Sequence, residues 1–190
     1  MKHSRKGFVI NVKRLLLLSG PMASGKTSVS AVLQEHFGFF PISSSYFLRT
    51  QLVGQGVVPD RHKLQELGDS LDRSTDFSWV IDSVARPAIN ARPDVDNWLL
   101  DSVRKSKQVE LFKHHYAAAV MHIHIDAPES VLQQRYAERS PNHLAEYQAN
   151  VRHPNELSAR SLGSMADKVF DTGALTAPEI ALQIIEIWER

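Results

Sequence analysis

The sequence predicts an α/β fold in which a parallel five-stranded sheet carries helices on both faces. Apolar runs alternate along the chain with segments of helical periodicity, which is typical of strand–helix–strand units built on a parallel sheet. The run at 15–19 is apolar almost throughout, as expected of a central parallel strand that is buried on both faces. Further strands are predicted at 39–42, 98–101, 120–126 and 168–171.

Helices are predicted between these strands. Residues 26–37 have apolar side chains at helical spacing, and Gly38 is typical of the residue that ends a helix. Another helix is expected at 128–138, with Pro128 in its first turn. A last helix is expected from about 177 to the end of the chain, whereas the segment from about 46 to 92 is polar and broadly helical.

Length and composition indicate one domain that spans residues 1–190. The chain is 43% hydrophobic, which is enough for one core, and it is too short for two ordinary domains. The net charge of +1 argues against a dedicated binder of nucleic acid or membrane surfaces. The lack of cysteine excludes disulfides and thiolate chemistry. No apolar stretch approaches the roughly 20 residues of a membrane span. The apolar run at 15–18 is too short for a signal peptide, so a cytoplasmic protein is expected.

A phosphate-binding loop is predicted at residues 20–27. The segment reads GPMASGKT and fits the pattern G-x-x-x-x-G-K-[ST] at every defined position, between an apolar strand and an amphipathic helix. Its glycines permit backbone geometries that a Cβ hinders, so that successive N–H groups can point at phosphate oxygens at a helix N-terminus. Lys26 supplies a cation for the β- and γ-phosphates. The residues predicted to bind ATP in this loop and helix start are Gly20, Ala23, Ser24, Gly25, Lys26, Thr27 and Ser28.

A magnesium site is expected beside this loop. Thr27 supplies a hydroxyl ligand, and a carboxylate at the end of a neighbouring strand should support the metal. Asp101 ends the apolar run at 98–101, and Arg104 follows in the same turn. Asp126 ends the next strand and is the competitor, although Pro128 follows closely and favours a helix-cap role for it. A simple cap is the alternative interpretation of Asp101 as well.

A pair of histidines lies in the predicted strand at 120–126. His122 and His124 alternate with isoleucines, and such a pair can form part of a zinc site. No acidic or cysteine partner has ligand spacing, so we interpret both histidines as buried structural residues.

Four further stretches follow the loop in order: FPISSSYFLR at 40–49, LDSVR and QVELF within 100–112, RYAER at 135–139, and ADKVFDTG at 166–173. Together with the loop they resemble the nucleoside and nucleotide kinase group of P-loop proteins, which includes adenylate kinase, dephospho-CoA kinase and small dephospho-CoA-kinase-related proteins. The resemblance covers most of the chain and implies a three-layer P-loop NTPase fold with a short helical lid at about 139–156. Ser45 and Ser102 replace an acidic residue and a glycine of the pattern, which leaves the acceptor open.

The resemblance also implies roles for several polar residues. Ser43 and Arg49, in an acceptor-binding insertion at about 43–95, would face the acceptor together with Arg104. Three arginines would close from the lid over the donor phosphates: Arg135, Arg139 and Arg152. Arg152 is also expected among the substrate-binding residues. The first two are spaced i and i+4 and so share one helix face, for which a solvated charged surface is the alternative. Arg152 is equally well placed to pair with Glu156.

These features predict an ATP-dependent phosphotransferase of the nucleoside monophosphate kinase type, which moves the γ-phosphoryl group to a nucleotide or nucleotide-like small acceptor with Mg²⁺. The predicted catalytic residues are Lys26, Asp101, Arg104 and Arg139. An acceptor phosphate needs no general base, whereas an acceptor hydroxyl would give its proton to Asp101. The alternative is a nucleotide-binding switch or slow ATPase that acts through a protein partner. A monomer or homodimer is expected.

Overall fold

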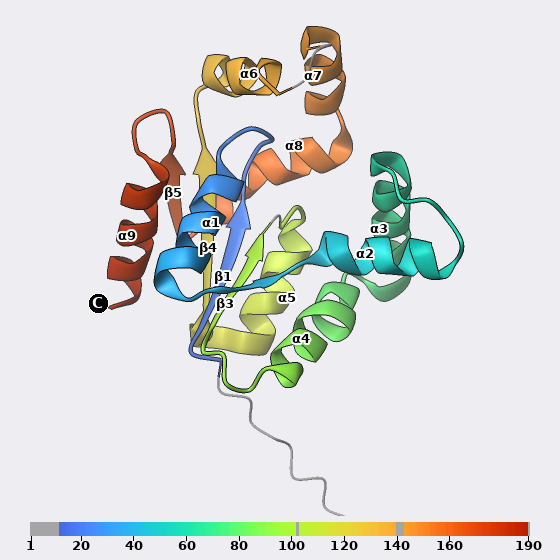
Figure 1. Ribbon diagram of the computed structural model, residues 1–190, viewed down its shortest axis with the longest axis vertical. Coiled ribbons are helices and arrows are strands. Elements are labelled where there is room, and N and C mark those ends of the chain that lie inside the picture. The colour runs from blue at the N-terminus through green and yellow to red at the C-terminus, as the bar shows by residue number, and fades with distance from the viewer. Residues whose placement is uncertain (1–11, 102, 140–142, 190) are drawn as a thin grey trace, which may run out of the picture.

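A computed structural model describes residues 12–101, 103–139 and 143–189 of the chain (Figure 1). Both ends of the predicted domain, Ser102, and residues 140–142 of the predicted lid lie outside the described residues.

The described strands form one parallel sheet, as predicted. The strands pair in the order β2-β3-β1-β4-β5, so that β1 is central and borders both β3 and β4. Pairing is parallel throughout. The bounds are β1 (Arg14–Ser19), β2 (Phe40–Ile42), β3 (Asn97–Asp101), β4 (Val120–Asp126) and β5 (Lys168–Asp171).

The two faces of the sheet are covered by different helices because successive side chains of a strand point to opposite sides. Leu16 and Leu18 of β1 pack in one core with α1 (Lys26–Phe37) and α9 (Ala177–Trp188). Leu15 and Leu17 pack in the other core with α5 (Ser106–Tyr116) and α4 (Arg86–Ala91). Figure 1 shows these helix pairs on opposite sides of the strands, which gives the predicted three layers.

The remaining helices gather at the carboxyl edge of the sheet and beside it. α2 (Ser44–Gly54), α3 (Arg61–Thr75) and the π-helical turn η1 (Val80–Ala85) precede α4 in the predicted insertion at 43–95. α6 (Glu129–Ala137) leads into the segment at about 139–156 in which the lid is predicted, and α7 (His143–Val151) and the first turn of α8 (Pro154–Ser161) lie within that segment (Figure 1). Two short 3₁₀ turns, η2 (Ala117–Ala119) and η3 (Leu162–Met165), complete the described elements.

A few local predictions differ from the structure. β2 begins one residue later than predicted, because Phe39 turns into the core beside α9 and its ring lies 5.9 Å from that of Trp188. Pro128 is the N-cap of α6 and not a residue of its first turn. The helix α5 was not predicted, since its N-cap residue, Lys105, makes no side-chain cap hydrogen bond that marks a helix start. Within the described residues, no helix has the length and apolar character needed to cross a membrane.

Candidate active site

The loop between β1 and α1 has the backbone shape that binds phosphate. Gly20 has φ of +138°, and a Cβ at this position would lie 2.0 Å from the carbonyl oxygen of Ile125, so only glycine fits. Gly25 has φ of +93° and is the N-cap of α1. Ala23 between them also has a positive φ, of 61°, a strained conformation for alanine that is found at functional sites. The predicted strand–loop–helix context is confirmed.

The ammonium group of Lys26 folds back over this loop. Its Nζ donates to the carbonyl oxygens of Gly20 at 2.8 Å and of Pro21 at 2.7 Å. Burial lowers the pKa of Lys26 to about 8, and the nearby carboxylates of Asp101 and Glu156 oppose this shift. The amine is therefore held at the mouth of the loop, where the negative charge of a bound phosphate would favour its protonated form.

A buried polar cluster supports the loop from below. The hydroxyl of Ser19, the residue before Gly20, lies 2.7 Å from Nε2 of His122 and 2.9 Å from Nδ1 of His124. Both histidines are fully buried, and burial lowers the pKa of His122 to about 4 and that of His124 below its usual value. They are neutral, structural residues, as predicted. In the described residues no group of three or more metal-binding side chains is found.

Two carboxylates flank the loop, because β3 and β4 both border β1. Asp101 ends β3, where its Cα pairs with Leu18 of β1. Asp126 ends β4, and its Oδ1 accepts the backbone N–H of Ala127 at 2.8 Å. The prediction that Asp126 caps the following helix is wrong, since Pro128 is the N-cap of α6. Thr27 is exposed in the first turn of α1. Its hydroxyl and the carboxylate of Asp101 are hard oxygen donors of the kind that Mg²⁺ prefers.

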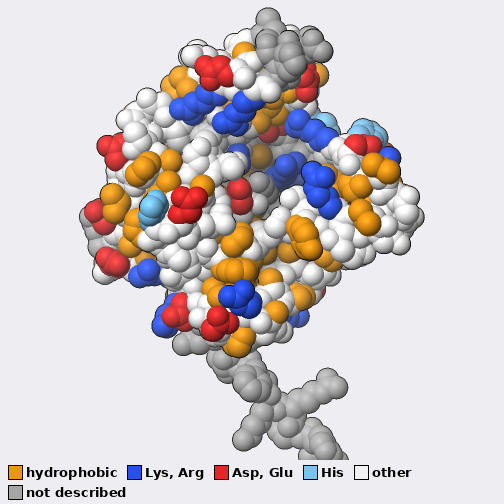
Figure 2. Space-filling view, viewed as in Figure 1, with side chains coloured by type: hydrophobic (Ala, Val, Ile, Leu, Met, Phe, Trp, Pro, Cys, Tyr) orange, Lys and Arg blue, Asp and Glu red, His pale blue; other side chains and the backbone are white. Residues whose placement is uncertain are grey.

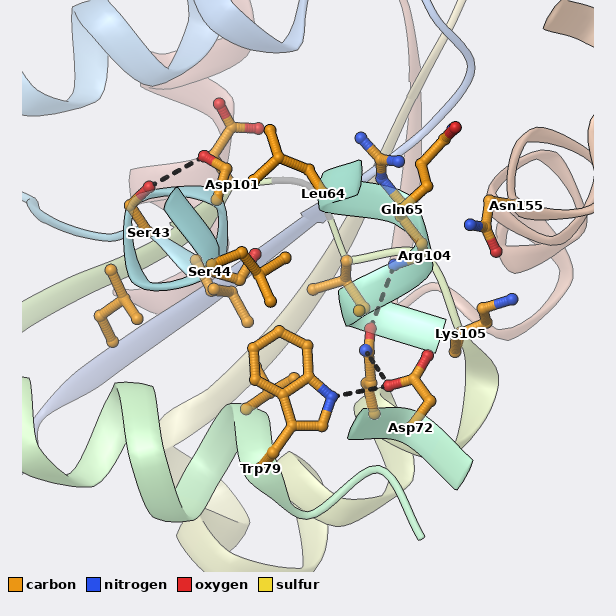
Figure 3. Close-up of a pocket in the computed structure, with 18 of the residues that line it drawn as sticks. Ser43, Ser44, Leu64, Gln65, Asp72, Trp79, Asp101, Arg104, Lys105 and Asn155 are labelled. Atoms are coloured by element: carbon orange, nitrogen blue, oxygen red, sulfur yellow. Dashed lines mark hydrogen bonds between the residues drawn. The ribbon is translucent and has the colours of Figure 1, made fainter. Parts of the chain in front are cut away.

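A cleft of about 540 Å³ lies between the sheet edge and the predicted insertion (Figure 3). Its polar walls include the three residues that were predicted on the acceptor side, Ser43, Arg49 and Arg104. Ser43 is the N-cap of α2 and accepts the backbone N–H of Tyr46. Other lining residues were not predicted: Arg61, Asp72, Trp79, Lys105, Gln108 and Asn155.

A second, smaller cleft of about 120 Å³ opens beside the phosphate loop and is lined by Gly20, Met22 and Lys26. The two clefts share one wall, which consists of Arg61, Gln65, Val103, Arg104 and Asn155. Figure 2 shows Lys and Arg side chains gathered around the hollow of this face. Loss of hydration, together with the charge of Arg61, lowers the pKa of Arg104. The Arg104 side chain is nevertheless exposed to solvent from the cleft.

The three lid arginines have different surroundings. The Arg135 guanidinium donates to the hydroxyl of Thr172 at 2.8 Å and to its carbonyl oxygen at 2.9 Å. The same hydroxyl lies 2.8 Å from the carbonyl oxygen of Ser24 and donates to it, which ties Arg135 to the phosphate loop. Arg139 and Arg152 are exposed and line neither cleft. The prediction that Arg135 and Arg139 share a helix face is wrong, because α6 ends at Ala137.

The lid contacts the phosphate loop through an acidic residue of α8. The Glu156 carboxylate accepts the backbone N–H of Met22 at 2.8 Å. The guanidinium of Arg160 lies 3.3 Å from the same carboxylate oxygen and 2.7 Å from Glu129. The Tyr147 hydroxyl donates to Glu129 at 2.6 Å. The alternative in which Arg152 pairs with Glu156 is wrong. The ion-pair partner of Glu156 is Arg160, which lies one helical turn after it.

Comparisons with known proteins agree with this fold. A model of the AAA domain family matches residues 16–151. A YorR protein from Bacillus subtilis, solved in complex with phosphorylated GDP, is 20% identical, with a TM-score of 0.53 over 92% of this chain and 95% of that one. A gluconokinase from Sinorhizobium meliloti is 15% identical, with a TM-score of 0.53 over 95% and 94% of the two chains. A shikimate kinase from Aquifex aeolicus is 17% identical, with a TM-score of 0.55 over 93% and 96%. No curated protein sequence matches the chain.

Proposed function

The chain belongs to the AAA domain family, in the P-loop kinase group, and on this premise we propose that it is an ATP-dependent phosphotransferase with a small nucleotide-like acceptor. The observation that carries the proposal is the wall shared by the two clefts. Arg61 and Arg104 line both the space beside Lys26 and the larger acceptor cleft. A donor phosphate on the loop and an acceptor in the cleft would therefore meet between the same two guanidinium groups.

Phosphoryl transfer requires mainly positioning of the reactants and neutralisation of charge on the transferring group. The N–H groups of the loop and Lys26 would bind the β- and γ-phosphates. Thr27 and Asp101 would hold Mg²⁺, which supplies charge neutralisation when it arrives with ATP. The planar forks of Arg61 and Arg104 suit phosphate oxygens and stay charged at all physiological pH values.

The acceptor cleft favours an anionic acceptor. It carries cationic side chains at Arg49, Arg61, Arg104 and Lys105. If the acceptor atom is a phosphate oxygen, it attacks the γ-phosphorus without a general base. If it is a hydroxyl oxygen, Asp101 takes the hydroxyl proton as the new P–O bond forms and ADP leaves. The names of the similar structures, a gluconokinase and a shikimate kinase among them, support transfer to a small molecule.

Arg139 and Arg152 stay predictions for the lid. Both are exposed on the segment that begins after α6, and closure of that segment would bring them toward the donor phosphates. Arg135 already contacts the loop through Thr172, and we assign it a positioning role there.

The test is transfer of phosphate from ATP and Mg²⁺ across a panel of nucleoside monophosphates, deoxynucleotides, nucleosides and dephospho-CoA. We expect transfer to one class of acceptor, and its loss in Lys26→Ala. The exposed Lys168→Ala variant is the matched control and should keep the activity. ATP binding with slow phosphate release, and with no transfer to any member of the panel, would instead favour the nucleotide-binding switch.

A further inference from the structure

The floor of the acceptor cleft holds a buried carboxylate that the proposed reaction does not use. Asp72 lies on α3, lines the cleft, and is only 7% exposed. The neighbouring walls are largely apolar and include Leu48, Leu64 and Trp79. A carboxylate in such surroundings is costly unless its oxygens are hydrogen-bonded, so its retention needs a reason.

One oxygen of this carboxylate is fixed by two donors from separate elements. Asp72 Oδ1 accepts the indole Nε1–H of Trp79 at 2.8 Å and the amide of Gln108 at 3.5 Å (Figure 3). The other end of Gln108 accepts the backbone N–H of Arg104 at 3.3 Å. These contacts set the rotation of the Asp72 carboxylate and connect it to the arginine that lies between the two clefts.

The other oxygen, Oδ2, is directed at the cleft. Within the described part of the chain, the side-chain hydrogen bonds of Asp72 all go to Oδ1. Oδ2 is not fully enclosed by the protein. Among the described residues, the one side-chain nitrogen or oxygen that is both fully buried and without a hydrogen-bond partner is His122 Nδ1. Burial raises the pKa of Asp72, whereas the Trp79 hydrogen bond and the charge of Lys105 oppose that shift. A pre-oriented acceptor oxygen therefore faces the space in which a ligand would lie.

The wall beside Oδ2 suits a planar ring. Trp79 is stacked on Phe47, with ring centroids 5.7 Å apart, and Leu48 and Leu64 complete this apolar side of the cleft. Two of the cationic residues, Arg61 and Arg104, lie toward the phosphate loop, since they also line the smaller cleft, whereas Lys105 lies near Asp72. A ligand with an anionic group at one end and a flat ring at the other would satisfy both ends of the cleft.

We propose that Asp72 determines acceptor specificity by accepting a hydrogen bond from an exocyclic amino group on the ring of the acceptor. The acceptor class is then a nucleoside monophosphate or a similar anionic molecule whose planar ring carries a donor at its far edge. This inference rests on the proposed function and deepens it. A site that is built to hydrogen-bond a substrate N–H rejects analogues without that donor, because the buried acceptor atom is then left unpaired.

The test compares nucleotides with and without an exocyclic amino group on the ring, with binding measured by calorimetry without ATP. The pairs are GMP and IMP, CMP and UMP, and AMP and purine riboside monophosphate. We expect the wild-type protein to bind the amino-bearing member of one pair at least about tenfold more tightly, as for a hydrogen bond to a charged group. Wild-type protein that shows no preference within any pair would overturn the proposal, and this measurement does not depend on a variant that folds.

Asp72→Asn sharpens the test because it replaces one acceptor oxygen of the side chain by an N–H₂ donor. Trp79 and Gln108 both donate, so the amide oxygen should keep the position of Oδ1 and the amide N–H₂ should face the cleft. We expect the preference within the pair to be lost or reversed, with ATP affinity and melting temperature close to those of the wild type. Asp69→Asn is the matched control, since Asp69 lines the same cleft but its Oδ1 accepts the Asn155 amide at 3.2 Å. Equal losses in both variants would indicate a general charge effect and would contradict a specific role of Asp72.

The outcomes separate this inference from the proposed function. Phosphate transfer to an acceptor without a ring donor, such as a sugar, would remove the role of Asp72 and leave the phosphotransferase standing. A donor preference in binding that depends on Asp72, without transfer of phosphate to any nucleotide, would keep the role of Asp72 in ligand binding and remove the kinase activity.

Discussion

The carboxylate of Glu156 accepts a hydrogen bond from the backbone N–H of Met22, 2.8 Å away, inside the phosphate loop. Loop N–H groups are the ligands of a bound nucleotide, so a protein anion holds one of the positions that a phosphate would occupy. Met22 also packs against the lid core formed by Leu132 and Tyr147. The lid and the loop therefore meet at this contact, and we predict that the Glu156 carboxylate competes with a bound phosphate.

Glu156→Gln should strengthen the binding of ATP. The variant keeps a hydrogen-bond acceptor for Met22 but removes a negative charge that repels the phosphates, and an increase in affinity of about threefold to tenfold is expected. The measurement is the Kd of MgATP by calorimetry. Glu138→Gln, which removes an exposed charge on the same lid, should leave the Kd unchanged. Unchanged or weaker ATP binding in Glu156→Gln would mean that the carboxylate does not compete with phosphate.

The stability of the nucleotide-free protein should rise between pH 8 and 10.5 through Lys26. Its pKa is about 8 in the folded chain and 10.5 in the unfolded chain, so the unfolded chain binds more protons in this window. The cost of burying the ammonium is fully present below pH 8 and is lost as the pH rises toward 10.5. The increase is at most about 3.5 kcal/mol, because the two pKa values differ by about 2.5 units and one unit corresponds to about 1.4 kcal/mol.

The comparison that isolates this effect uses Lys26→Met. Urea unfolding of both proteins across the same pH window cancels the titration of other groups, and the variant should lack the increase. Saturating ATP should move the wild-type increase to higher pH, because phosphate stabilises the charged amine. Parallel curves for the two proteins would contradict the lowered pKa.

Arg104→Ala should reduce kcat and raise the KM for the acceptor, whereas Arg49→Ala should raise the KM alone. Arg104 lines both clefts, so it would contact the transferring group, but Arg49 lines only the larger cleft. Loss of a charged hydrogen bond corresponds to roughly a 10- to 150-fold change in kcat/KM. Steady-state kinetics with each variant check this, with the exposed Arg73→Ala on α3 as the control. Identical effects of the Arg104 and Arg49 substitutions would exclude a position of Arg104 between the two substrates.

Thr172→Val should weaken both the fold and ATP binding. The hydroxyl joins Arg135 of α6 to the carbonyl oxygen of Ser24, and its loss leaves polar groups unpaired at about 1–3 kcal/mol. Thermal unfolding and the Kd of MgATP should both shift. Thr50→Val removes a hydroxyl that, among the described residues, donates to the carbonyl oxygen of Tyr46 within α2, and it should have little effect on either.

The loop was predictable because its chemistry is local in sequence. A close approach of Gly20 to Ile125 and a helix start at Gly25 impose glycine at fixed spacing, and this spacing can be read without the fold. The strands were predictable for a similar reason, since a buried parallel strand must be apolar over its whole length.

The acceptor floor and the lid contacts were not predictable in this way. Asp72, Trp79 and Gln108 come from three parts of the chain and meet only because η1, which begins after Trp79, packs against α5. Arg160 was missed because its partner Glu129 is 31 residues away, whereas the sequence offered Arg152 at helical spacing from Glu156. Arg61 had one local signal, since it follows the N-cap Asp60 and so begins a helix.

The close contact at Gly20 has a consequence for how this scaffold can change over evolutionary time. Any side chain at Gly20 would collide with the backbone of β4, so substitution of this residue is blocked by a steric clash. The acceptor cleft, in contrast, is lined in part by side chains that project from α2 and α3, where replacements leave the main chain in place. Substitutions in this cleft are therefore expected to be tolerated more easily than a substitution of Gly20.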